Sequence, residues 1–171
     1  LNQGDHTVCA LLRASSDASK LQEQNIEVIR IDLHSSKSLE RLFPKDIDAL
    51  VHCAGGGWSK RQEDLFQSNT ETTIRVLEAA QQSKVKHFIL LSSIAAAGPG
   101  ENLNEDKEAK PVSMYGKSKF AAEQSAITFS KFFQVSILRA PAIYGSGDTR
   151  FLPFFQSIRN GWCPCPPGKS M

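Results

Sequence analysis

Short runs rich in β-branched residues alternate along this chain with longer segments whose apolar residues recur every three or four positions. Five runs are predicted as strands: residues 7–12, 26–31, 49–53, 87–91 and 135–138. Three segments are predicted as helices: residues 36–43, 62–83 and 113–133. This alternation is typical of βαβ units, in which right-handed crossovers join parallel strands. The sequence therefore predicts one α/β domain over residues 1–171, with a doubly wound, Rossmann-type parallel sheet.

The charge and hydropathy patterns restrict the kinds of partner. The chain has 20 basic and 18 acidic residues in 171, a formal net charge of +2, and the two signs are interspersed. No basic stripe suggests nucleic acid, no apolar run reaches the roughly 18 residues of a membrane span, and no secretory signal is present. We therefore expect a cytoplasmic protein whose partner is a small-molecule substrate.

The cysteines are not spaced as metal ligands. Cys163 and Cys165 are too close together and have no second pair, and Cys9 and Cys53 lie in strand-like runs where a thiol packs as a small hydrophobe. The sequence therefore predicts no metal site.

A serine, a tyrosine and a lysine border the same predicted crevice. Ser92 and Ser93 end the strand HFILL, and a polar loop over residues 98–111 leads to the helix that begins near YGKSK. Tyr115 and Lys119 are four residues apart and share one helix face. Free tyrosine has a pKa of about 10, and a nearby ammonium group favours the phenolate that a base requires. A serine hydroxyl could steady charge on a substrate oxygen, although the alternative is that both serines cap a helix or a turn.

These elements resemble the active site of the extended short-chain dehydrogenase/reductases, often called the NAD-dependent epimerase/dehydratase family. The matching segments are SSIAAAG at residues 92–98 and YGKSK at residues 115–119. The resemblance implies that Ser93, five residues before the glycine, is the catalytic serine together with Tyr115 and Lys119.

Four other segments resemble cofactor-binding motifs of the same family. They are IDL at 31–33, VHCAGG at 51–56, NTETTIRVLEAA at 69–80 and LRAPAIYGSGD at 138–148. Thr72 replaces a family glycine, and Ala140 and Ser146 replace prolines. The resemblance implies a cofactor site that includes Tyr115, Lys119 and the residues Asp32, Leu33, Cys53, Ala54, Gly55, Asn69, Pro141 and Ala142.

The end of the first predicted strand bears on the choice of cofactor. NAD-specific relatives carry an acidic residue there, whereas this chain has Leu12 and Arg13, followed by Ser15 and Ser16. Arginine with hydroxyl groups suits a 2′-phosphate, so the sequence favours NADP over NAD. The alternative is that Arg13 is a solvated strand end.

The resemblance also implies that the chain is truncated at both ends. The family's first strand with its Gly-x-x-Gly-x-x-Gly loop would precede Leu1, and the substrate region would follow Met171. In the family's strand order, 3-2-1-4-5-6, the absent strand lies between residues 7–12 and 49–53. We expect the isolated chain to be marginally stable and unable to hold dinucleotide, and the full-length parent to be compatible with a homodimer.

The resemblance implies an oxidoreductase or epimerase that transfers hydride at a carbon bearing a hydroxyl or carbonyl group. Ile94, Ala95 and Ala96 stand where family dehydratases carry acidic residues, which disfavours dehydration. The alternative function is a non-catalytic NADP-binding sensor or assembly subunit on the same fold.

Overall fold

The computed structural model describes residues 6–33, 39, 43, 46–57, 61–145, 149 and 151–162. These form two units, Leu1–Pro141 and Ala142–Met171, which we treat separately. The predicted helix over residues 36–43, apart from Leu39 and Phe43, lies outside the described residues, as do Ser146, Cys163 and Cys165.

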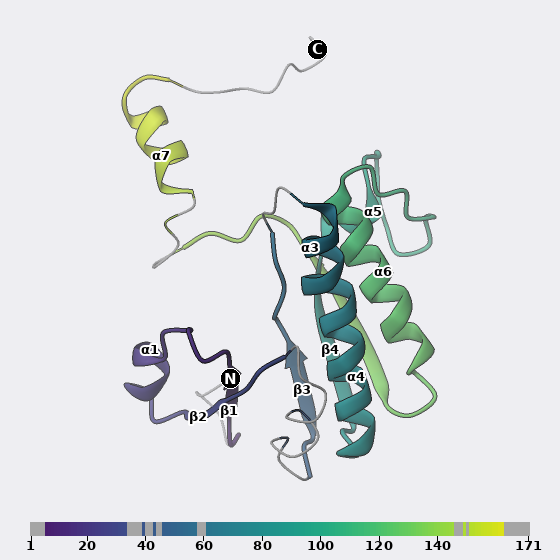
Figure 1. Ribbon diagram of the computed structural model, residues 1–171. Helices are drawn as coiled ribbons and strands as arrows, with labels where there is room; N and C mark the ends of the chain where they lie inside the picture. Colours follow the sequence, from purple (N-terminus) through teal and green to yellow (C-terminus); the bar gives the residue numbers. More distant parts are fainter. Residues whose placement is uncertain are drawn as a thin grey trace. The chain divides into compact units, whose positions relative to one another are not determined.

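The strands of the first unit form the predicted parallel α/β arrangement (Figure 1). They are β1 Cys9–Leu12, β2 Glu27–Arg30, β3 Ala49–His52, β4 His87–Ser93 and β5 Gln134–Ala140. β1 pairs with β2, and β3, β4 and β5 pair in that order. Among the described strands no ladder joins β1 to β3, the position at which the expected order places one more strand. The Rossmann-type fold with an incomplete sheet is therefore confirmed.

The helices of the first unit agree with the prediction in part. They are α1 Ser19–Gln22, α3 Gln62–Phe66, the π-helix η1 Gln67–Glu71, α4 Thr72–Gln82, α5 Ile94–Ala97 and α6 Met114–Thr128. The helix predicted over 62–83 is a continuous run of α3, η1 and α4. In the second unit, α7 spans Leu152–Arg159. No helix in the described part of the chain is both long and apolar enough to cross a bilayer.

The helix predicted over 113–133 ends earlier, at Thr128, because Phe129 and Phe133 pack in the core. Phe129 stacks on Phe133 with ring centroids 6.2 Å apart, and Phe133 stacks on Phe88 of β4 at 5.8 Å. A further helical turn would carry Phe133 away from β4, so the chain turns and enters β5 at Gln134.

The core lies against one face of β4. Phe88, Leu90 and Ser92 alternate along this strand and are buried, as period-two geometry requires. Buried side chains of α4 and α6, including Leu77 and Ala122, complete the same cluster. Burial of this face fixes which residues of β4 point toward α6, and it thereby positions the site at the end of the strand.

His52, the last residue of β3, is buried beside this core. Its Nε2 lies 3.1 Å from the Thr73 hydroxyl of α4, and its ring lies 5.9 Å from that of Phe88. Burial, with a smaller contribution from the Lys119 cation, lowers the pKa of His52 from 6.5 to about 4. Because the unfolded chain binds this proton more readily, the native state loses stability as pH falls from 6.5 toward 4.

We expect His52→Asn to remove this part of the acid sensitivity. Between pH 7 and pH 4.5 the wild-type protein should lose about 2–3 kcal/mol more unfolding free energy than the variant. Urea unfolding of both proteins at the two pH values measures the difference. Equal losses in the two proteins would contradict the assignment of a buried neutral histidine.

Candidate functional site

The predicted catalytic tyrosine lies in the first turn of α6. Ser113 caps this helix, since its Oγ accepts the Gly116 N–H at 3.0 Å. The cap starts the helix one residue before Tyr115, which is half-buried. Tyr115 and Lys119 are therefore one helical turn apart, as predicted.

Gly116 allows α6 to approach α5 closely. A Cβ atom at this position would lie 2.2 Å from the Ala95 carbonyl oxygen, far inside van der Waals contact. The glycine in YGKSK is therefore a packing requirement. It brings the start of α6 against the segment that follows Ser93.

Lys119 reaches from α6 to the carboxyl end of β4. The residue is only 5% exposed, and its Nζ donates a hydrogen bond to the Leu91 carbonyl oxygen at 2.7 Å. Burial lowers the pKa of Lys119, while the Glu123 carboxylate and, to a smaller extent, Cys53 oppose this shift. A buried, fixed amine one helical turn after a half-buried tyrosine is compatible with a tyrosine base that has a cationic helper.

The two serines at the end of β4 have different surroundings. Ser92 is buried and its hydroxyl donates to the Glu123 carboxylate. Ser93 is half-buried and caps α5, because its Oγ accepts the Ala95 N–H at 3.2 Å. Ser92 is thus committed to the interior, which leaves Ser93 as the serine at the surface of the site.

Asn69 fixes the loop that follows β3. Its Oδ1 accepts the Gly56 N–H and its Nδ2 donates to the Gly56 carbonyl, both at 2.9 Å. The second Nδ2 hydrogen goes to Ser118 of α6, also at 2.9 Å. With 1% exposure, Asn69 supports the loop from inside. It belongs to η1, and π-helical turns are frequently found at functional sites.

The other predicted cofactor residues of this sheet follow its strand ends. Directly after β3, Gly55 is exposed and Ala54 is half-buried. Cys53 is also exposed, so the prediction that it packs as a small hydrophobe is wrong: the strand ends at His52, one residue before it. A Cβ atom on Gly55 would lie 2.5 Å from Asn69 Oδ1, so this loop needs a glycine. Pro141 is exposed after β5, and Ala142 begins the second unit.

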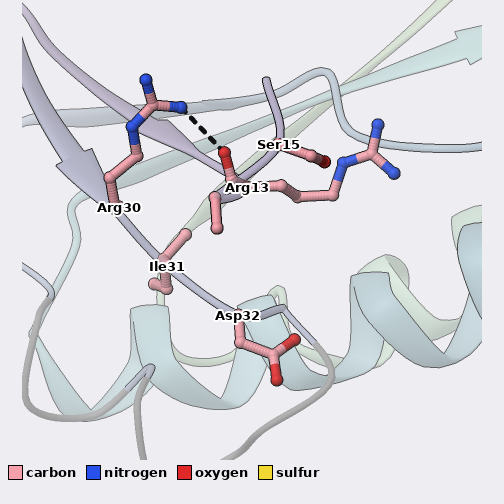
Figure 2. A pocket seen from close by; sticks show the side chains of 6 residues that line it. Arg13, Ser15, Arg30, Ile31 and Asp32 are labelled. Carbon is pink, nitrogen blue, oxygen red and sulfur yellow. Dashed lines mark hydrogen bonds between the residues drawn. The ribbon is translucent and has the colours of Figure 1, made fainter. Parts of the chain in front are cut away.

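A second group of predicted residues lines a hollow of about 350 Å³ at the carboxyl ends of β1 and β2 (Figure 2). Its lining consists of Arg13, Ala14, Ser15, Arg30, Ile31 and Asp32. The structure thus brings the predicted Arg13, Ser15 and Asp32 together. Leu33 follows, and its half-buried side chain packs against the core.

Sequence reasoning missed Arg30, which organises this hollow. Its Nη1 donates to the carbonyl oxygens of Arg13 at 2.9 Å and Ser16 at 2.6 Å, and so holds the turn after β1. In Figure 2 the Arg13 guanidinium extends away from that of Arg30. The signal that could have identified Arg30 is its register, since it pairs with Leu12, the residue before Arg13.

The polar loop over residues 98–111 is closed at its base. Lys110 N–H donates to the Ala97 carbonyl at 2.8 Å, and Gly98 has a φ of +85°. A Cβ atom on Gly98 would lie 2.0 Å from the Lys110 carbonyl oxygen, so the neck of the loop admits only glycine. The loop therefore holds the end of α5 and the start of α6 at a fixed separation.

The fold agrees with what the sequence comparisons show. Residues 1–166 match the family described as the NAD dependent epimerase/dehydratase family, and the chain belongs to this family. It is 31% identical over 150 residues to a putative dihydroflavonol 4-reductase of Synechocystis sp., with 83% of this chain and 43% of the relative covered. It is 33% identical over 151 residues to the UDP-glucose 4-epimerase of Vibrio cholerae, with 80% and 45% covered.

A solved structure gives the same fold. The UDP-glucuronic acid 4-epimerase of Bacillus cereus, in complex with NAD, superposes with a TM-score of 0.74 at 23% identity, over 92% of this chain and 56% of that one. The chain spans less than half of the length of the two curated relatives.

We expect Gly116→Ala to destabilise the protein. Alanine gains about 1 kcal/mol over glycine in helix propensity, but overpacking costs about 1–3 kcal/mol or more. The atom in the way is a backbone oxygen, which cannot rotate aside, so the clash should exceed the gain. Thermal unfolding of the variant measures the net effect.

Gly57→Ala is the matched control, because nothing lies within 4 Å of a Cβ atom at that position. This control should keep the wild-type unfolding temperature. A stabilised Gly116→Ala variant would show that α5 and α6 do not require the close approach.

Proposed function

We propose that this chain forms the cofactor-binding part of an NADP-dependent oxidoreductase or epimerase, in which Ser93, Tyr115 and Lys119 are the catalytic residues. The observation that supports this most is the buried Lys119 amine, fixed on the Leu91 carbonyl one helical turn after Tyr115. A lysine is rarely buried without a specific task, because burial disfavours its charge.

In this proposal each side chain has one task at the substrate carbon. Tyr115 takes the hydroxyl proton when the substrate is oxidised to a carbonyl, and returns it when the carbonyl is reduced. The Lys119 ammonium stabilises the phenolate. When bound, the nicotinamide supplies the acceptor or donor of the hydride. A reductase uses this step once and an epimerase uses it twice.

Ser93 can cap α5 and bind the substrate at once. Its Oγ is the acceptor in the bond with Ala95 N–H, so its own hydrogen is available to a substrate oxygen. This donor would stabilise the negative charge that develops on the oxygen during hydride transfer. The cap also restricts the directions in which the hydroxyl can donate.

The residues that would hold the dinucleotide fall at strand ends, where open α/β sheets bind ligands. The exposed loop over Cys53, Ala54 and Gly55 provides backbone against which a ribose can lie, with Asn69 shaping it from behind. Asp32 and Leu33 would flank the adenine, and Pro141 the nicotinamide. Gly55 lets this loop lie close to Asn69, with which a larger residue would clash.

Arg13, Ser15 and Arg30 favour NADP. Two arginines and a serine contribute to the lining of one small hollow, and guanidinium and hydroxyl groups recognise phosphate oxygens through charge-assisted hydrogen bonds. Among the described residues that line the hollow, Asp32 is the single carboxylate. It follows β2 by two residues, whereas NAD-specific relatives carry their acidic residue at the position of Leu12, the end of β1.

We expect Tyr115→Phe in the full-length protein to abolish turnover, by a factor of at least about 100, because it removes the transferable proton. NADP affinity should stay within a few-fold of wild type. Lys119→Ala should reduce both turnover and affinity, whereas Lys117→Ala, exposed on the same helical turn, should reduce neither. Steady-state kinetics and NADP titration measure these effects.

Undiminished turnover by Tyr115→Phe would remove the catalytic assignment. A wild-type protein that binds NADP but turns over neither hydroxyl nor carbonyl substrates would favour the alternative function, a cofactor sensor or assembly subunit.

We expect Arg13→Ala to weaken NADP binding by about 1.5–3 kcal/mol, the contribution of a hydrogen bond to a charged group. NAD binding should hardly change, because NAD lacks the 2′-phosphate. Titration of both cofactors against the variant and wild type measures this selectivity. Lys20→Ala, which removes an exposed charge from the neighbouring α1, is the control. An equal loss of affinity for NADP and NAD would overturn the proposed preference for NADP.

A further inference from the structure

Glu123 is a buried carboxylate with partners on two strands. The residue is 1% exposed and lies on α6. Arg139 of β5 donates to it from Nη2 at 2.7 Å and from Nε at 3.1 and 3.2 Å, and the Ser92 hydroxyl of β4 donates to Oε1. Arg139 pairs with Ser92 across the sheet, so the two donors approach the carboxylate side by side.

Glu123 lies one helical turn after Lys119 and on the same face of α6. The two side chains meet consecutive residues of β4, since Lys119 donates to the Leu91 carbonyl and Glu123 accepts from Ser92. Two opposite charges therefore connect one helix to one strand end, next to the proposed catalytic residues.

Stability alone does not account for this arrangement. A buried ion pair is often no more stabilising than apolar side chains of the same volume, because both charges lose their hydration. The Lys119 amine carries a desolvation penalty of its own, and the Glu123 carboxylate is the largest influence that opposes the resulting fall in its pKa. The carboxylate thus favours the charged form of the Lys119 amine, in addition to its hydrogen bonds with Ser92 and Arg139.

We propose that Glu123, anchored by Arg139 and Ser92, is a positioning residue that keeps the Lys119 amine protonated and fixed at the end of β4. In the described part of the chain, the other titratable groups that interact with this amine are His52 and Cys53 at the end of β3, and Tyr115 lies one helical turn before it on α6. His52 is neutral above pH 4, so it cannot replace the carboxylate. The Arg139 cation is paired with the Glu123 carboxylate, and its positive charge partly cancels the electrostatic effect of that carboxylate on the Lys119 amine.

The catalytic consequence rests on the proposed function, but the charge on Lys119 can be measured without turnover. In the full-length protein labelled with ¹⁵N-lysine, the Nζ resonance that disappears in Lys119→Arg reports the titration of this amine. We expect Glu123→Gln to lower its midpoint by about one pH unit, because the amide keeps the shape and removes the charge. Arg139→Gln should raise the midpoint, because it removes the positive charge that partly cancels the effect of the Glu123 carboxylate on the Lys119 amine.

Glu71→Gln is the matched control. It removes one carboxylate from an exposed i,i+4 pair with Arg75 and should leave the Lys119 midpoint unchanged. The opposite sign for Arg139→Gln keeps the test decisive even where Glu123→Gln folds poorly. An unchanged midpoint in a folded Glu123→Gln protein, or a lowered one in Arg139→Gln, would overturn the proposal.

The alkaline limb of the pH–rate profile links this inference to the proposed function. In an active enzyme that limb should shift downward in Glu123→Gln together with the Lys119 midpoint. A shifted midpoint without any wild-type turnover would retain the role of Glu123 and reject the catalytic function. A shifted midpoint with an unchanged alkaline limb would overturn the catalytic part of the proposal alone.

Discussion

The hydrogen bond from Lys119 Nζ to the Leu91 carbonyl is the contact on which the rest of the site depends. A buried amine needs a fixed acceptor, since an unpaired charge in the interior would cost several kcal/mol. The bond therefore requires α6 to dock on β4 at one distance and in one register. Gly116 provides the distance by admitting the Ala95 carbonyl, and the buried face of β4 provides the register.

Asn69 extends this constraint to β3. It joins the loop after β3 to Ser118, whose neighbour in the chain is Lys119. Thr70 Oγ1 adds a bond to the Ser118 carbonyl at 2.9 Å. Asn69 and Thr70 both belong to the π-helical turn η1, and both bond to Ser118 of α6. Hydrogen bonds thus join the loop, the helix and the strand end, which is the preorganisation that the proposed catalytic role requires.

The strands were predictable because β-branched runs and buried alternation are local signals. The shortest helices were not: Ile94–Ala97 forms a single turn whose cap, Ser93, belongs to the preceding strand. The end of α6 depends on Phe133 stacking with Phe88, which are 45 positions apart, and helical periodicity carries no information about such a contact. The positions of Ser93, Tyr115 and Lys119 came from a motif, whereas the role of Glu123 needs Ser92 and Arg139, which only folding brings together. A sequence alone assigns a lone glutamate to the surface.

The serine at the end of β4 shows why a structural and a catalytic interpretation need not exclude each other. A hydroxyl has one hydrogen to donate and two lone pairs, and the α5 cap uses only a lone pair. Because the Ala95 N–H occupies that lone pair, the remaining hydrogen has a restricted range of directions. Ala95 also contributes the carbonyl against which Gly116 packs. One residue of α5 therefore orients the serine through its N–H and positions the tyrosine helix through its carbonyl, so the separation of these two groups is set by a single peptide segment.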